Sequence, residues 1–259
     1  MKSISDYQPG TDLLHERIIL VTGASSGIGA AAAKAFAAHG ATVIMLARSV
    51  PKLEAIYDEI INAGHPQPAI YPMDLEGATY AHYEELATTL EKEFGRLDGL
   101  LHNAAMLGSL MMLEQHDLGL WAKTLQVNLT APFLLSRACL PLMRLSEDAS
   151  VIFTSSAVAH HGKAYWGAYG VSKAGADNLM QMMADELENN TPIRVNSIDP
   201  GAVATQMRRK VYPGEDPRSL PKPETIMATY LYLMGPDSKG ETGHIFTIDK
   251  QKIPQPAKE

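Results

Sequence analysis

The chain has 259 residues, and its hydrophobic fraction of 46% is enough to bury a substantial core, which excludes a disordered or fibrous protein. The formal net charge is -7 without a long basic run, which argues against a nucleic-acid-binding surface. The single Cys139 excludes an internal disulfide, and no stretch has the pattern of a membrane span or a signal peptide, so we expect a cytoplasmic protein.

Short apolar segments alternate with longer amphipathic or alanine-rich segments along the chain. The β-branched and apolar runs predict strands, and the runs with helical spacing predict helices. We expect strands at 17–22, 41–47, 69–73, 97–102, 150–154, 193–198 and 244–248, and helices at 28–39, 51–63, 80–94, 121–145 and 168–187. The alternation predicts an α/β fold with a doubly wound parallel sheet of about seven strands and helices on both faces. No linker or internal repeat divides this pattern.

A glycine-rich loop, Thr22-Gly-Ala-Ser-Ser-Gly-Ile-Gly29, joins the first predicted strand to the first predicted helix. Its glycines permit a sharp turn and let a pyrophosphate approach the helix N-terminus, where unpaired N–H groups favour an anion. The missing Gly-Lys-Ser/Thr argues against an ATP-binding P-loop. The same residues match the nucleophile elbow of α/β-hydrolases with Ser25 as nucleophile, but the short segment before Gly23 has no room for the earlier strand that this site needs.

Arg48-Ser49 follows the second predicted strand, where a dinucleotide-binding fold recognises the adenosine ribose. An acid at this point would pair with a 2′-hydroxyl, whereas an arginine fits a 2′-phosphate. Arg48 therefore favours NADP over NAD. The alternative interpretation is that Arg48 is only solvated at the strand end.

Tyr169 and Lys173 are four residues apart in a predicted helix, so their side chains share one face. A tyrosine usually titrates near ~10, and a neighbouring ammonium favours the phenolate and lowers this pKa. The pair therefore predicts that Tyr169 acts as a general acid or base. Tyr165 competes for this role, but only Tyr169 has a lysine four positions later.

In these motifs the chain resembles the short-chain dehydrogenase/reductase family, of the single-domain type, over roughly residues 14 to 250. The glycine loop matches the family's cofactor loop, Asp74-Leu75 matches its adenine-side aspartate, and Asp199-Pro-Gly-Ala-Val-Ala-Thr205 matches its segment beside the nicotinamide carboxamide. Within the family the chain is most similar to bacterial YciK-like oxidoreductases, through Asp12-Leu-Leu and Trp166-Gly-Ala-Tyr169. The resemblance implies that residues 1–259 form a single dinucleotide-binding catalytic domain with a Rossmann-type sheet.

The resemblance also implies an NADP(H)-dependent oxidoreductase that transfers a hydride between the nicotinamide and a carbonyl or alcohol substrate. The implied catalytic residues are Asn128, Ser156, Tyr169 and Lys173. Ser156 would hold the substrate oxygen, Tyr169 would exchange the proton, Lys173 would lower the pKa of Tyr169 and hold the ribose, and Asn128 would position a water. The implied cofactor-binding residues are Gly23, Ser25, Ser26, Gly27, Ile28, Gly29, Arg48, Ser49, Asp74, Leu75, Asn103, Ala104, Tyr169, Lys173, Pro200, Gly201, Val203 and Thr205.

Each implied catalytic residue also has a purely structural interpretation. Ser156 could be a turn residue at a strand end, Tyr169 a core aromatic, Lys173 a surface lysine and Asn128 a polar residue that interrupts a helix. The alternative function for the whole chain is a catalytically silent NADP-binding regulatory or scaffold protein of the same fold.

The chain departs from the family pattern in two places. The family's Asn-Asn-Ala-Gly reads His102-Asn103-Ala104-Ala105 here, and we expect the Ala105 methyl to narrow the space beside the cofactor. The family's C-terminal Asp-Gly-Gly reads Asp249-Lys250-Gln251, which puts the usual tetramer contacts in question. We therefore expect a homo-oligomer, either a dimer or a tetramer.

The segment 201–223 is rich in proline and charge and follows a strand end, so we expect it to be a substrate lid; the alternative is a surface insertion. Its basic run 208–210 predicts a solvated loop or, alternatively, part of a pocket for an anionic group. Met106, Leu107, Trp166 and Met207 are expected to line an apolar substrate site, with His160-His161 at its mouth. The histidine pair lacks the carboxylates or cysteines of a metal site, and Cys139 lies in an apolar helical pattern that predicts packing.

Overall fold

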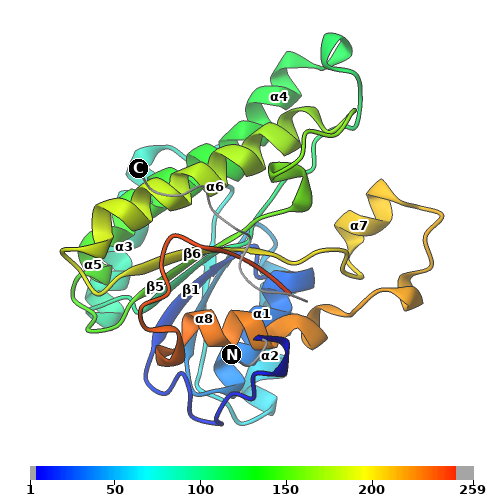
Figure 1. Cartoon of the computed structure of the whole chain (residues 1–259). Helices are drawn as coiled ribbons and strands as arrows, with labels where there is room; N and C mark the ends of the chain where they lie inside the picture. Colours follow the sequence, from blue (N-terminus) through cyan, green and yellow to red (C-terminus); the bar gives the residue numbers. More distant parts are fainter. Residues whose placement is uncertain (1–3, 249–259) are drawn as a thin grey trace.

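The computed structural model describes residues 4–248 and contains one sheet of seven parallel strands (Figure 1). The strands lie in the order β3-β2-β1-β4-β5-β6-β7. Their bounds are β1 (Ile18–Thr22), β2 (Thr42–Ala47), β3 (Ala69–Pro72), β4 (Gly99–His102), β5 (Ser150–Thr154), β6 (Arg194–Asp199) and β7 (Ile245–Thr247). The predicted doubly wound parallel sheet is confirmed. The strand order reverses at β1, which pairs with both β2 and β4, and ligands bind at the carboxyl ends of strands beside such a point.

Helices cover both faces of the sheet (Figure 1). One layer contains α1 (Gly27–Ala38), α2 (Val50–Asn62) and α8 (Met227–Met234). The other contains α3 (Tyr80–Phe94), α4 (Leu118–Leu125), α5 (Ala131–Met143) and α6 (Gly167–Glu188). The short helix α7 (Gln206–Val211) projects away from both layers (Figure 1). Within residues 4–248 the structure has no helix long and apolar enough to cross a membrane, and the cytoplasmic location stays a prediction.

The strands are buried on both faces because their alternate side chains enter two separate cores. Ile19 and Val21 of β1 pack with side chains from α1, α2 and α8, whereas Leu20 between them packs with α3, α5 and α6. Strands with this double burial read as continuous apolar runs, which is why the sequence identifies them well. Cys139 of α5 is fully buried, so its predicted packing role is confirmed.

The helix predicted at 121–145 is a continuous helical run built from three parts. A π-helical turn, η3 (Gln126–Thr130), joins α4 to α5. The run begins earlier than predicted because the Asp117 carboxylate accepts a hydrogen bond from the Leu120 N–H at 2.6 Å and caps the helix. A π turn inside a helix redirects side chains, and this one contains Asn128.

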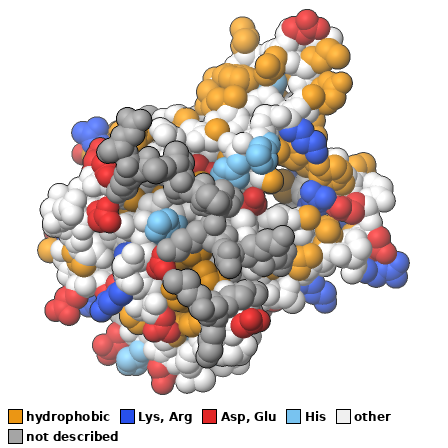
Figure 2. All heavy atoms as spheres, in the orientation of Figure 1, with side chains coloured by type: hydrophobic (Ala, Val, Ile, Leu, Met, Phe, Trp, Pro, Cys, Tyr) orange, Lys and Arg blue, Asp and Glu red, His pale blue; other side chains and the backbone are white. Residues whose placement is uncertain are grey.

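Helix α8 has no counterpart among the elements predicted from sequence. Its residues Met-Ala-Thr-Tyr-Leu-Tyr-Leu-Met are apolar all round, so they show no amphipathic period, as is usual for a fully buried helix. By contrast, Leu113 and Leu118 are largely exposed at the outer end of α4, where Figure 2 shows hydrophobic side chains gathered.

Candidate active site

A cavity of about 730 Å³ lies at the carboxyl ends of the strands, beside the point where the strand order reverses. The loops that follow β1, β2, β4, β5 and β6 line it, together with residues of α6 and α7. Every catalytic and cofactor residue predicted from sequence lines this cavity except Gly29 and Asn128. The structure thus brings together residues from position 23 to position 205 in one space whose size suits a bound organic ligand.

The glycine loop lies directly against the segment after β4. Gly23 has φ +68°, and a Cβ on it would lie 2.8 Å from the Cα of Ala104. A Cβ on Gly29 would lie 2.6 Å from Nδ2 of Asn103. Gly29 does not line the cavity itself, but its missing side chain allows the loop to pack this closely against Asn103. The Thr22 hydroxyl accepts hydrogen bonds from the N–H groups of Asn103 and Ala104, at 3.0 and 3.1 Å. The contacts fix the N-terminus of α1 at the cavity, where its N–H groups favour an anion.

Two cations stand at the end of the cavity formed by β2 and β3. The Arg48 side chain is 68% exposed, and its Nη1 lies 4.0 Å from Oδ1 of Asp74. Lys52, in the first turn of α2, lines the same cavity and was missed in the sequence. The sequence signal that could have identified Lys52 is its position four residues after Arg48. At the start of a helix, this position points the side chain back toward the end of β2.

Ser156, Tyr169 and Lys173 meet at the carboxyl end of β5. Ser156 follows β5 by two residues, and the other two come from the first turns of α6. Tyr169 and Lys173 are buried, with 8% and 4% of their surface exposed. The Lys173 ammonium donates a hydrogen bond to the Thr154 carbonyl at 2.6 Å and lies 5.8 Å from the centre of the Tyr169 ring. The predicted sharing of one helical face is confirmed.

Burial dominates the electrostatics of this pair. It raises the pKa of Tyr169 to about 12; a side-chain hydrogen bond with Ser156 acts in the opposite direction, and the charge of Asp199 raises this pKa further. Burial lowers the pKa of Lys173 to about 8, opposed by the charges of Asp177 and then Asp199. The lowered tyrosine pKa expected from sequence is therefore wrong for this geometry, because desolvation of the phenolate outweighs the hydrogen bond with Ser156.

Asn128 is buried in the π turn and faces the loop after β4. Its Oδ1 accepts a hydrogen bond from the Met106 N–H at 2.7 Å, and its Nδ2 donates to the Met106 carbonyl at 2.8 Å. Nδ2 also donates to the Ser172 hydroxyl at 2.9 Å. Asn128 thus ties the loop after β4 to α6, one residue from Lys173. The water-positioning role predicted for it stays a prediction.

The family-atypical His102 is buried at the end of β4, behind the cavity. Its Nε2 lies 2.8 Å from the Ser136 hydroxyl, and its ring packs 4.6 Å from that of Phe153. Burial lowers the pKa of His102 to about 3, and the charge of Lys173 acts in the same direction, so the imidazole is neutral at pH 7. Ala105 lines the cavity, as expected. Asp249-Lys250-Gln251 lies outside the described residues.

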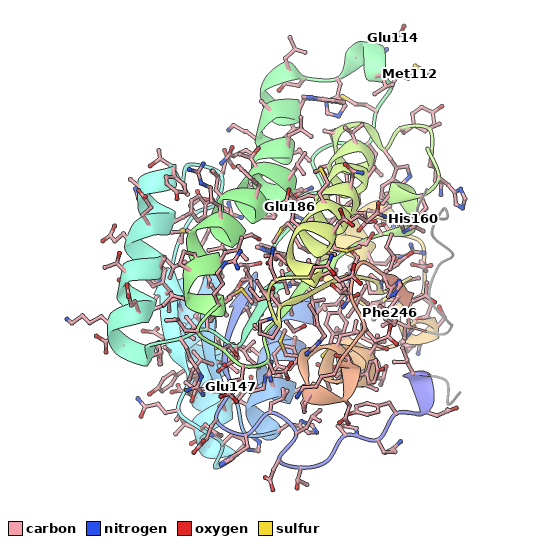
Figure 3. The ribbon with its side chains drawn as sticks, turned by 60° about the vertical axis from the view of Figure 1, so that its left-hand side comes forward. Met112, Glu114, Glu147, His160, Glu186 and Phe246 are labelled. Carbon is pink, nitrogen blue, oxygen red and sulfur yellow. The ribbon has the colours of Figure 1, made fainter. Side chains whose placement is uncertain are left out.

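The four apolar side chains expected at the substrate site, Met106, Leu107, Trp166 and Met207, all line the cavity. The histidine pair does not, so its predicted place at the mouth is wrong. The turn η4 (Ala157–Ala159) directs His160 toward α6 (Figure 3), where its Nε2 lies 3.7 Å from Oδ2 of Asp177, while His161 is exposed. Residues 4–248 contain no group of three side chains suited to hold a metal ion.

The basic run 208–210 lies in the helix α7 and not in the solvated loop that we expected. Arg208 and Lys210 line the cavity. The Arg208 guanidinium donates to both carboxylate oxygens of Glu215 at 2.7 Å and lies 3.9 Å from the centre of the Tyr212 ring. The Lys163 ammonium donates to the Tyr212 hydroxyl at 3.2 Å and so connects this segment to the loop before α6. Figure 2 shows basic and acidic side chains side by side over this projecting part of the molecule.

Comparison with known proteins identifies a family. The family model described as short chain dehydrogenase matches residues 17–216. The uncharacterized oxidoreductase YciK of Escherichia coli K12 is 43% identical over 248 residues, which cover 96% of this chain and 98% of the relative. A short chain dehydrogenase structure from Pseudomonas syringae has a TM-score of 0.91 and 52% identity, covering 94% of this chain and 99% of the other. A short chain dehydrogenase from Escherichia coli CFT073, complexed with NADPH, has a TM-score of 0.90 and 43% identity over 93% and 100% of the two chains.

Proposed function

Because the chain belongs to the short chain dehydrogenase family and resembles the YciK oxidoreductase, we propose that it is an NADP(H)-dependent oxidoreductase that interconverts a carbonyl compound and its alcohol. The observation that carries the proposal is the convergence of Ser156, Tyr169 and Lys173 on a cavity whose far end holds the glycine loop and Arg48. A reacting group and a dinucleotide would therefore share one cavity.

The residues around the cavity suit NADP. Gly23 keeps its floor clear of side-chain atoms, the N-terminus of α1 favours the pyrophosphate, and Arg48 and Lys52 offer two cations to a 2′-phosphate. Relatives of this chain support the assignment, since the Escherichia coli CFT073 protein was crystallised with NADPH and a Shigella flexneri protein with NADP. When bound, NADPH supplies the hydride that reduces the carbonyl carbon.

The side chains of the chain itself supply orientation and the proton. Ser156 donates a hydrogen bond to the substrate oxygen and stabilises the negative charge that develops there. Tyr169, within hydrogen-bond reach of Ser156, gives its phenolic proton to that oxygen, and its raised pKa keeps this proton in place at neutral pH. Lys173 has a pKa of about 8, so it can return a proton to Tyr169 near neutral pH. Both side chains are largely shielded from solvent, with at most 8% of their surface exposed.

We further propose that the whole chain acts as a single catalytic domain in which residues 201–223 form a substrate lid. Met207, Arg208 and Lys210 of this segment line the cavity, and the contact between Lys163 and Tyr212 ties the lid to the loop that carries Ser156. Its basic side chains would favour a substrate with an anionic group beside its carbonyl.

We also propose a homo-oligomer. On α5 and α6, the large apolar side chains of Phe133, Val171 and Met182 are 44%, 49% and 50% exposed, so they are available for contact with a second chain. Val171 and Met182 are eleven residues apart, close to three helical turns, so they lie on one face of α6. Sedimentation velocity of the purified protein would give the number of subunits.

The central test is NADPH oxidation over a panel of ketones, aldehydes and quinones that includes phenanthrenequinone. We expect Tyr169→Phe to lower kcat by about 100-fold or more, because it removes the proton donor, and to leave the affinity for NADPH nearly unchanged. Tyr165→Phe, which removes the competing and exposed hydroxyl, should retain full activity. NADPH binding without turnover that depends on Tyr169 would favour the catalytically silent alternative.

A further inference from the structure

A buried carboxylate lies directly behind the proposed proton-transfer residues. Asp177 is 4% exposed and follows Tyr169 and Lys173 on α6 at intervals of four residues, so the three side chains share one face of the helix. Its two oxygens are both used. Oδ2 accepts a hydrogen bond from the Ser155 hydroxyl at 2.5 Å, and Oδ1 accepts one from the Ser197 hydroxyl at 2.7 Å.

The two serines belong to neighbouring parts of the sheet, because Ser155 directly follows β5 and Ser197 lies in β6. Ser155 directly precedes Ser156, and its N–H donates to the Ile198 carbonyl at 2.7 Å. Ser197 lies in β6, two residues before Asp199 at the edge of the cavity. The Asp177 carboxylate therefore ties α6 to the ends of both β5 and β6. A change of this tie would move Ser156 relative to Tyr169.

The same carboxylate is the negative charge that acts most strongly on Lys173. Its charge raises the pKa of Lys173 against the larger lowering by burial, and Asp199 of β6 acts in the same direction. The other groups that face Asp177 are Lys173 on its own helix, the two serine hydroxyls, and His160 after η4, whose Nε2 lies 3.7 Å from Oδ2. Burial raises the pKa of Asp177 itself, while the serine hydrogen bonds and the charges of His160 and Lys173 favour the carboxylate.

We propose that Asp177 is a positioning residue of this site, which holds the Ser156 turn and keeps the Lys173 ammonium charged in the geometry that proton transfer by Tyr169 requires. This inference rests on the proposed oxidoreductase function. It gives a function to a carboxylate that burial alone would disfavour, since an unpaired buried charge is costly and this one has partners on three elements.

The test is Asp177→Asn, which keeps the shape and one acceptor oxygen but removes the charge. With NADPH and phenanthrenequinone we expect kcat to fall about 10-fold or more, while the KM for NADPH changes little. The alkaline limb of the kcat profile should move to lower pH by about half a unit or more, because Lys173 then loses its proton more easily. Asp177→Glu should restore the position of this limb. Glu186→Gln, an equal loss of charge on an exposed part of α6, should match the wild type.

A second variant covers the case in which Asp177→Asn does not fold. Ser155→Ala removes one hydrogen bond of the tie and keeps the charge, so kcat should fall while the alkaline limb stays in place. Wild-type kcat in Ser155→Ala, or an unmoved limb in a folded Asp177→Asn, would overturn the proposal. Tyr169→Phe, measured in parallel, separates the proposed function from the positioning role of Asp177. If Tyr169→Phe stays active, the proposed function fails. If Tyr169→Phe is inactive but Asp177→Asn behaves as the wild type, only the positioning role fails.

Discussion

The titratable groups around the cavity fall into two sets with opposite surroundings. The inner network, made of His102, Tyr169, Lys173, Asp177 and Asp199, is at most 8% exposed, and strand ends and serine hydroxyls hold it. The rim, made of Arg48, Lys52, Arg208 and Lys210, is partly or largely exposed. Buried charges must be satisfied inside the protein, whereas exposed ion pairs contribute about 0–1 kcal/mol. We infer that the inner network determines the reaction and the rim determines which ligands bind.

The largest effect is expected from His102→Asn, which places the family's usual residue in the inner network. His102 has a pKa of about 3 in the folded chain and an ordinary value of 6.5. Between these values the unfolded chain binds a proton that the folded chain does not, so the free energy of unfolding falls as pH drops below 6.5. From pH 7 to pH 4 this loss amounts to about 3 kcal/mol, and His102→Asn should not show it.

Urea unfolding at the two pH values measures this difference. Ser136→Ala, which removes the hydrogen-bond partner of His102 but keeps the imidazole, is the matched control and should retain the loss in acid. If the difference in free energy of unfolding between wild type and His102→Asn is the same at both pH values, the folded chain does not hold His102 neutral. Water would then reach the inner network more easily than its burial indicates.

The next largest effect is expected at the rim. Arg48→Ala should raise the Kd of NADPH about 10-fold, near the lower end of the range for a charge-assisted hydrogen bond because Arg48 is well exposed, and should hardly change the Kd of NADH. The loss should shrink at high salt, since exposed charges are screened. Fluorescence titration with both cofactors measures it, with Arg209→Ala, an exposed arginine outside the cavity lining, as control. An equal rise in the Kd of NADPH and of NADH would show that Arg48 does not recognise the 2′-phosphate.

The inner network and the rim differ in how well the sequence predicts them. The contact between Tyr169 and Lys173 could be predicted because residues four apart in a helix are neighbours on its surface. The glycine loop could be predicted because only glycine allows the backbone to come so close to another segment. The strands were visible because burial on both faces gives continuous apolar runs. Local rules therefore predicted the sheet, the cavity lining and the helical face of the site.

Features that depend on distant contacts could not be predicted in this way. The direction of the Tyr169 pKa depends on how deeply the fold buries the ring, and the direction of the His160 side chain depends on the turn η4 and on Asp177 seventeen residues later. Asp177 has no local motif, since its partner Ser155 follows β5 and its partner Ser197 lies in β6, both about twenty residues away in the chain. Helix α8 was missed because a helix that is apolar all round has no period to detect.

The smallest effect tests whether the rim acts on substrate alone. In Tyr212→Phe the ring stays beneath the Arg208 guanidinium, but the hydroxyl loses its hydrogen bond from Lys163 at 3.2 Å and its contact with the Arg208 side chain. A net loss near 0.5–1 kcal/mol for an exposed hydrogen bond corresponds to a rise of about 2- to 5-fold in the substrate KM, because the proposed lid would be held less firmly beside the cavity. The value of kcat should not change, since we propose that proton transfer takes place within the inner network. Tyr71→Phe, on β3 outside the cavity lining, is the control for loss of a tyrosine hydroxyl. A fall in kcat without a change in KM would mean that the lid shapes the reaction itself, and the separation between inner network and rim would then be wrong.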